Sequence, residues 1–474
     1  MRRSSGNTSV AGGFAQGILL AVLCLAAAAW AADEMAVQYH GAGWIQFGRV
    51  ENSSDTLSNQ NLAEYNFNKN WIQNTGGQIT AVGKISANWE GGLGLGAVQV
   101  SNSRGSLAGA HTWSNGWNPF VTEARMTYSQ PLGDKDKFQL TLGSFPYTYN
   151  PDTKNLGLYL TRGQVYPGTL ISGFETKHIQ PTAASQVGAL ARMQMGGLQN
   201  DLLLNSETET KPYFDFSLAD IAGYQVTPWL QIGVGVNFYR LIPQNSRVTS
   251  PDVSCALDAE WSASNLADES DRCYIPDTVK ADTGIVRDSL GNPQINAITG
   301  SMSGTKLMAR FHFDPKLLFG WSGIGTRAFG KNDWVLYGEA ALLGIKNYPK
   351  YYSDRWRRVP VMLGVNLPAF GLLDKFSIEV EYYGSLNYPD YEKAETNASW
   401  IPRAPGTGLD NSRNDWKWSL YASRALLGHL RIAGQVANDH LVIPGPPAAS
   451  DPDWSEALTT PRDWYWMLKL AYFF

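Results

Sequence analysis

The sequence predicts an all-β protein that folds as a transmembrane antiparallel β-barrel of sixteen strands, with a range of fourteen to eighteen. Three observations lead to this fold class. Short segments along the whole chain alternate apolar residues with polar or small ones, which is the period of a β-strand. The links between these segments alternate between short and long. Beyond residue 32, no run approaches the roughly 18 consecutive apolar residues of a spanning helix.

The two-residue period is clearest in ten segments. In the last of them, 463–474, one face from Trp464 to Phe474 is entirely apolar or aromatic, and we expect it to close the barrel against the first segment. Asp220 interrupts the apolar face of its strand. Three alternatives would explain it: a bulge, a position at the depth of the lipid headgroups, or a different strand boundary. The ten segments are 36–50, 78–89, 137–143, 186–195, 229–239, 305–313, 374–384, 415–423, 429–437 and 463–474.

The predicted links fall into two classes, and the long class carries most of the Pro, Asn, Asp and Ser. A soluble β-sandwich is the competing fold, but it would have shorter loops on both sides, and no repeat of constant period suggests a propeller. The short links are 90–92, 131–136, 196–199, 227–228, 314–332, 368–373 and 426–428. The long links are 51–76, 101–118, 148–185, 207–213, 243–302, 346–356, 387–414 and 439–461.

The N-terminus has the features of a secretory signal peptide. Two arginines precede an apolar run at 17–30, which ends at a small-x-small motif, Ala-Trp-Ala. We therefore expect residues 1–31 to be cleaved and residues 32–474 to form a single barrel domain. An uncleaved membrane anchor is the alternative, which the short length of the run disfavours.

Composition agrees with a large exported β protein. Aromatic residues make up 12% of the chain, and glycine occurs 47 times. The 38 basic residues stand against 42 acidic ones, which gives no sign of nucleic-acid binding. Cys255 and Cys273, in the long link 243–302, are expected to pair in an oxidising compartment. A metal pair is the alternative, but no histidine accompanies the cysteines, and we expect neither a metal nor a cofactor.

The signal peptide, the alternating strands across Ala36–Phe474 and the terminal "YWMLKLAYFF" resemble Gram-negative outer-membrane β-barrels of the sixteen-stranded porin layout. The resemblance implies residence in the bacterial outer membrane, surrounded by its lipid, with short periplasmic turns and long extracellular loops. It also implies that Tyr472 and Phe474 serve as the signal for the barrel-assembly machinery. A homotrimer is one assembly that the resemblance suggests.

If the apolar faces meet lipid, the alternate faces line the lumen. Charges that faced hydrocarbon would cost roughly 2–4 kcal/mol each near the midplane, which favours this assignment over its inverse. Three glutamates and a pair of cations, Lys306 and Arg310, are expected to form patches that set a transverse field, although internal ion pairs are the plainer reading. The pore-lining candidates are Lys84, Glu123, Arg125, Arg192, Lys306, Arg310, Glu339, Arg358, Glu379, Glu381, Lys417 and Arg431.

The long link 148–185 is too apolar for a solvated loop. In the porin layout the third outer loop often folds into the barrel, so the resemblance implies that this link narrows the lumen. The alternative is that residues 169–178 form a further strand or pack on the rim. The constriction candidates are Asp152, Lys154, Arg162, Glu175 and Lys177.

These observations favour a channel for passive diffusion of small hydrophilic solutes or ions, with a mild preference for anions. A sugar-selective channel or a surface glycan-binding barrel is the alternative, suggested by aromatic residues in the outer links at 113–120, 347–356 and 386–391. An enzyme is least supported, because the chain has no G-x-S-x-G or H-E-x-x-H motif and no convincing Ser–His–acid set.

Overall fold

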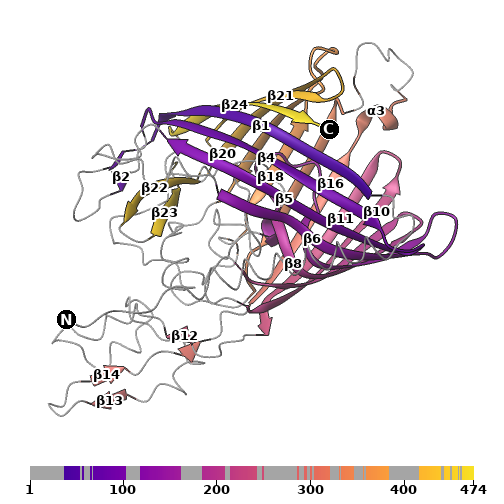
Figure 1. Ribbon diagram of the computed structural model, residues 1–474, viewed down its shortest axis with the longest axis horizontal. Coiled ribbons are helices and arrows are strands. Elements are labelled where there is room, and N and C mark those ends of the chain that lie inside the picture. Colours follow the sequence, from indigo (N-terminus) through magenta and orange to yellow (C-terminus); the bar gives the residue numbers. More distant parts are fainter. Residues whose placement is uncertain are drawn as a thin grey trace.

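Sixteen strands of the protein, seen in a computed structural model, close on themselves as one antiparallel barrel (Figure 1). This confirms the predicted fold class and strand number. The structure describes residues 37–53, 56–57, 65–66, 68–102, 118–161, 184–208, 214–242, 248–249, 285–287, 293–295, 299–300, 304–320, 330, 332–345, 356, 359–383, 416–438, 442–448, 451–456, 458 and 462–474.

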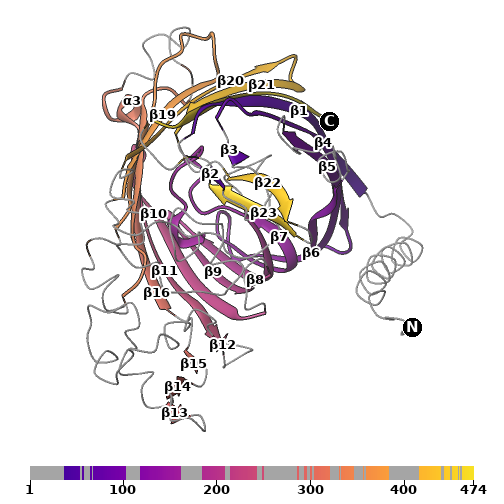
Figure 2. The same cartoon turned by 90° about the vertical axis from the view of Figure 1, so that its left-hand side faces the viewer.

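Each barrel strand pairs with its nearest barrel neighbours in the chain, and β24 also pairs with β1 to complete the ring (Figure 2). The barrel strands are β1 (Val37–Asn52), β4 (Trp71–Lys84), β5 (Trp89–Asn102), β6 (Asn118–Pro131), β7 (Lys137–Tyr147), β8 (Ala184–Met195), β9 (Leu198–Ser206), β10 (Phe216–Thr227), β11 (Leu230–Ile242), β16 (Gly304–Phe313), β17 (Val335–Leu342), β18 (Val361–Asn366), β19 (Lys375–Tyr382), β20 (Trp416–Leu426), β21 (Leu430–Ala437) and β24 (Trp464–Phe473).

The remaining elements are small. Four two-stranded sheets, β2–β3, β12–β15, β13–β14 and β22–β23, belong to the long links, and Figures 1 and 2 place β22–β23 at one mouth of the barrel. Within the described residues, no helix is long and apolar enough to cross a membrane. The small elements are β2 (Thr56–Leu57), β3 (Tyr65–Asn66), β12 (Val248–Thr249), β13 (Ile285–Arg287), β14 (Pro293–Ile295), β15 (Thr299–Gly300), β22 (Val442–Ala448), β23 (Asp451–Glu456), η1 (Tyr159–Thr161) and α3 (Pro315–Leu318).

The C-terminal strand closes the barrel as predicted. Its register sets Phe47 opposite Leu468 and Gly43 opposite Tyr472. Gly41 and Phe474 exchange backbone hydrogen bonds of 3.0 and 3.1 Å at the end of the ladder. A Cβ at Gly41 would collide with the Phe474 ring, so glycine at this position lets the last aromatic side chain contact the backbone of β1.

The two faces of each strand differ as the two-residue period predicts. On β24, Leu470 and Tyr472 are 40% and 51% exposed on the outer surface, whereas Tyr465 and Ala471 face inward and are 2% and 4% exposed. The outer surface is therefore apolar and suited to lipid, and the buried positions belong to the lumen.

One predicted turn is placed differently. The link between β4 and β5 is 85–88, not 90–92, because Trp89 already pairs with β6 and its carbonyl accepts hydrogen bonds from the N–H groups of Ile85 and Ser86. The composition of the Gly-Gly pair at 91–92 predicts a turn. Instead it lies inside β5, and a Cβ at Gly92 would crowd the inward side chains of Glu123 and Arg125.

Candidate functional site

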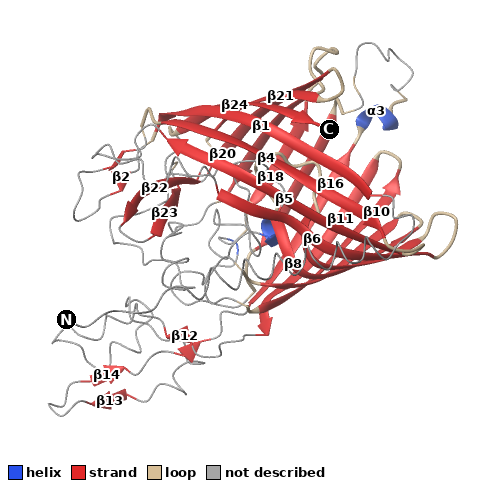
Figure 3. Ribbon diagram, in the orientation of Figure 1, coloured by secondary structure: helices blue, strands red, loops and turns tan. Residues whose placement is uncertain are grey.

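Residues 148–161, here called the inserted segment, follow β7 into the barrel interior. Tyr149, Leu156, Tyr159 and Leu160 are buried there in one apolar cluster with inward side chains of β8–β10 and β16–β18. The segment ends in the short helix η1, drawn in blue among the barrel strands in Figure 3. Burying these aromatic and leucine side chains stabilises the segment inside the barrel.

Glu379 on β19 holds the first half of this segment. Its carboxylate accepts three backbone N–H hydrogen bonds, from Lys154 at 2.6 Å, Asn155 at 2.9 Å and Leu156 at 3.1 Å. The Tyr337 hydroxyl donates a fourth, at 2.9 Å. A buried carboxylate that accepts this many hydrogen bonds is strongly attached to its donors.

Glu339 on β17 holds the segment at both ends. It accepts hydrogen bonds from the Tyr149 hydroxyl at 2.5 Å, from Asn150 Nδ2 at 2.9 Å and from the Tyr159 N–H at 2.9 Å. Glu381 on β19 adds one bond of 3.1 Å from the Tyr159 hydroxyl. Glu339, Glu379 and Glu381 therefore all face inward, and all three bind the inserted segment.

Neighbouring strands hold the other side of the segment. Asn237 Nδ2 on β11 donates to the Leu160 carbonyl at 2.9 Å, and Lys306 Nζ on β16 lies 3.5 Å from the Tyr159 carbonyl. His312 Nδ1, also on β16, lies 2.8 Å from Asp152 Oδ2. The segment is thus held from β11 to β19, which is one side of the barrel.

Lys154 is the charged residue of the segment with the most restricted environment. Its ammonium donates to the Asp152 carbonyl and lies 5.6 Å from the centre of the Tyr337 ring. Burial lowers the pKa of Lys154 from 10.5 to about 8, while the nearby Glu379 carboxylate acts in the opposite direction.

Lys306 and Arg310 do not lie across the lumen from the glutamates. Both are on β16, which pairs with β17 so that Arg310 stands directly opposite Glu339 in the ladder. The predicted opposed patches therefore share one wall, and the transverse field expected from them does not span the lumen. Consecutive strands of an up-and-down barrel are neighbours, so the order of these strands along the chain already indicated that the two groups lie side by side.

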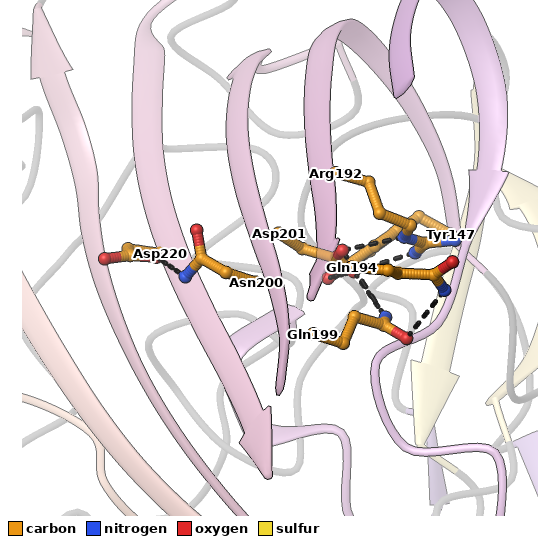
Figure 4. A network of polar contacts seen from close by, with 7 residues as sticks. All are labelled: Tyr147, Arg192, Gln194, Gln199, Asn200, Asp201 and Asp220. Carbon is orange, nitrogen blue, oxygen red and sulfur yellow. Dashed lines mark hydrogen bonds and ion pairs between the residues drawn. The ribbon is translucent and has the colours of Figure 1, made fainter. Parts of the chain in front are cut away.

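A second polar network lies on β7–β9. Arg192 forms a bidentate ion pair with Asp201, both bonds being 2.7 Å, and the Tyr147 hydroxyl donates to the same carboxylate at 3.1 Å (Figure 4). Sequence reasoning missed Asp201, although it lies opposite Arg192 in the β8–β9 register. A matching inward position on the next strand was the available signal.

On the β4–β6 wall, Arg125 lies between two carboxylates, Glu90 at 3.0 Å and Glu123 at 3.2 Å. Lys84 also faces inward, at the end of β4 and opposite Glu90 in the ladder. For Arg125, the plainer reading of an internal ion pair holds.

The wall formed by β20, β21, β24 and β1 carries three inward cations. Lys417 Nζ donates to the Leu458 carbonyl at 3.0 Å. The Arg431 guanidinium lies 5.0 Å from the centre of the Phe473 ring, and Lys469 Nζ lies 5.7 Å from that of Trp44. Arg431 and Lys469 therefore lie beside aromatic rings, whereas the glutamates of β17 and β19 bind the inserted segment.

Asp220 lies on the outer surface, as its place in the strand pattern suggested. Asn200, also outward, donates to its carboxylate at 2.6 Å, and Figure 4 shows this pair apart from the Asp201 network. The ladder of β10 is regular at Asp220, so neither a bulge at this residue nor a wrong boundary explains it. Pairing with the amide lowers the cost of an outward carboxylate.

Several predicted residues lie outside the described residues, and their roles stay predictions. Both cysteines are among them, so the expected disulfide is untested. The outer-link aromatics are also largely outside, apart from 118–120 and Trp356. The undescribed site candidates are Arg162, Glu175, Lys177, Cys255, Cys273 and Arg358.

Sequence comparison finds no matching protein family and no matching curated protein. Among solved structures, the chain is similar to a triple mutant of the Rhodopseudomonas blastica porin, with 7% identity, a TM-score of 0.40 and coverage of 93% of this chain and 100% of that one. It is also similar to Pseudomonas putida OprB, with 10% identity, a TM-score of 0.46 and coverage of 92% and 94%. The likeness concerns the barrel, and no residue role follows from it. The porin layout expected from the sequence agrees with the closed sixteen-stranded ring.

Proposed function

We propose that the protein is an outer-membrane, porin-like channel for passive diffusion of small hydrophilic solutes or ions. The observation that carries the proposal is the division of the barrel interior. The inserted segment packs against inward side chains from β8 to β19. The remaining strands carry inward charged side chains, among them Arg125, Arg431 and Lys469, between small apolar clusters. A barrel with an apolar outer surface and a polar inner wall supports water-filled passage.

The same division supports a preference for anions. Glu339, Glu379 and Glu381 are bound to the inserted segment, so their charges are satisfied by N–H and O–H donors. Arg431 and Lys469 lie on the other wall beside aromatic rings. Cations along the path of solutes raise the local concentration of anions and lower that of cations.

The expected setting completes the proposal. Residues 1–31 direct export, the described outer surface contacts outer-membrane lipid, and the barrel-assembly machinery reads Tyr472 and Phe474. The inserted segment, together with the rest of 148–185, narrows the lumen, and Cys255 and Cys273 pair in the loop 243–302. A homotrimer is the proposed assembly. The proposal involves no catalysis and no cofactor.

Planar-bilayer recording of the purified protein tests the channel. We expect stepwise conductance and, in a tenfold KCl gradient, a reversal potential of the sign given by chloride preference. Absence of any conductance from correctly folded protein would contradict the proposal, and clear cation preference would contradict its anion component. Current blockade by neutral oligosaccharides, if found, would favour the alternative of a sugar-selective channel.

A further inference from the structure

Five side chains gather on the outer surface at the long-link end of β1, β4 and β24. They are here called the rim cluster: Arg49, Glu51, Lys69, Trp71 and Trp466. Arg49 and Glu51 share the outward face of β1 with Phe47, because Gly48 and Val50 between them are buried inward positions. The cluster therefore faces the surroundings of the barrel and not its lumen.

Glu51 holds the charged groups of the cluster together. Its carboxylate lies 2.8 Å from Lys69 Nζ and 3.5 Å from Arg49 Nη1, and it accepts a hydrogen bond of 2.9 Å from the Trp466 indole. Two cations thus share one carboxylate, which leaves the cluster with an excess positive charge. The side chains of Arg49 and Lys69 are 31% and 51% exposed, so both remain accessible from outside.

Aromatic rings set the depth of the cluster in the membrane. Trp466 packs edge-on against Trp71 with centroids 5.7 Å apart, and against Phe47 at 6.0 Å. The Arg49 guanidinium lies 5.3 Å from the centre of the Trp71 ring. Tryptophan at the end of a membrane strand marks the level of the lipid headgroups, so the two cations lie at that level.

A second aromatic pair at the same end of the barrel provides a contrast. Tyr382 and Trp416 lie outward at the long-link ends of β19 and β20, with ring centroids 4.9 Å apart. Among the described outward residues of these two strands, none is charged at that end. An aromatic rim therefore forms without cations, and the positive charge of the rim cluster calls for a separate explanation.

We propose that the rim cluster binds the phosphate of an anionic lipid headgroup in the leaflet that meets the long-link end of the barrel. Arg49 and Lys69 contact the phosphate oxygens, since guanidinium and ammonium groups pair well with phosphate. Trp71 and Trp466 lie alongside the neutral part of the headgroup. Glu51 acts as a positioning residue that holds the two cations together. The inference rests on the membrane-spanning barrel of the proposed function, but not on the channel.

Native mass spectrometry of the full mature chain tests the inference. The folded protein in neutral detergent is titrated with phosphatidic acid and, separately, with phosphatidylcholine. We expect wild type to retain one phosphatidic acid about tenfold more tightly than phosphatidylcholine, which corresponds to the pairing of one phosphate with two cations. Equal retention of the two lipids by wild type overturns the inference, whatever the variants do.

Two double variants that each remove two positive charges, at opposite ends of the barrel, locate the binding site. Arg49→Gln with Lys69→Gln should remove the preference, while Arg49→Lys, which keeps the charge, should retain most of it. The control, Lys135→Gln with Arg424→Gln, removes two cations at the short-turn end and should keep the preference. Equal loss in the control overturns the inference, because net charge alone would then explain the binding. A folded barrel that binds phosphatidic acid without conducting would contradict only the proposed channel.

Discussion

Two halves of the barrel interior follow the same two-residue alternation, but their inward charged residues have different partners. On β17 and β19, inward carboxylates hold the inserted segment through its backbone N–H groups and tyrosine hydroxyls. On β21 and β24, inward cations lie beside aromatic rings of the wall. An inward position alone therefore does not make a charged residue part of the pore lining. What it meets inside the barrel decides whether it binds protein or faces solute.

Removing the core of the inserted segment tests this contrast most severely. Deletion of residues 151–158 should raise single-channel conductance about twofold or more, because the segment occupies one side of the lumen. It should also make the channel less anion-preferring, since Glu379 would lose its three backbone N–H donors and face water. Unchanged conductance of a folded variant would refute the narrowing role of the segment.

Loss of the Glu379 carboxylate should strongly weaken the attachment of the inserted segment to the barrel wall. Glu379→Ala leaves three backbone N–H groups without their acceptor, and we expect a loss of about 3 kcal/mol in unfolding free energy. Urea unfolding in lipid vesicles, followed by tryptophan fluorescence, measures it. Glu379→Gln keeps one acceptor oxygen and is the matched control, with a smaller expected loss. Equal stability of Glu379→Ala and wild type would show that these bonds do not hold the segment.

The ion selectivity of the channel should depend on the cations of β21 and β24 and not on the glutamate of β17. Arg431→Gln with Lys469→Gln should lower the chloride-to-potassium permeability ratio about twofold, because these cations lie on the wall away from the segment. Glu339→Gln should leave the ratio nearly unchanged, since its charge is bound to the segment. Reversal potentials in a salt gradient measure both. A larger change in the permeability ratio from Glu339→Gln than from the double cation variant would contradict this assignment of the two walls.

The smallest expected effect is a pH dependence from Lys154. Its pKa in the folded protein, about 8, is below the ordinary 10.5, so the unfolded chain binds more protons between these values. Attachment of the segment should therefore strengthen as the pH rises through about 8 toward 10.5. Fluctuations of the open-channel current should decrease over this range in wild type. Lys154→Met should lack this component, and identical pH profiles of the two proteins would refute the assignment.

Much of the barrel could be predicted because lipid and water impose a strict two-residue period. The outward Leu470 and Tyr472 and the inward Glu379 and Lys417 all follow from it. The turn between β4 and β5 could not be placed, because Gly91 and Gly92 have the composition of a turn but serve close packing inside a strand. Asp201 was missed because its importance depends on register with Arg192, which the sequence of one strand does not reveal.

Local sequence was enough to predict the class of fold, the number of strands, the closing role of the last strand and the inward face of the described pore-lining candidates. These follow from local alternation, since each residue either meets lipid or does not. Which inward charges meet the inserted segment depends on the folded barrel. Lys154 and Glu379 are 225 positions apart in the chain, and Asn150 and Glu339 are 189 apart. Ring closure and the path of the segment bring them together, and no local pattern encodes that distance.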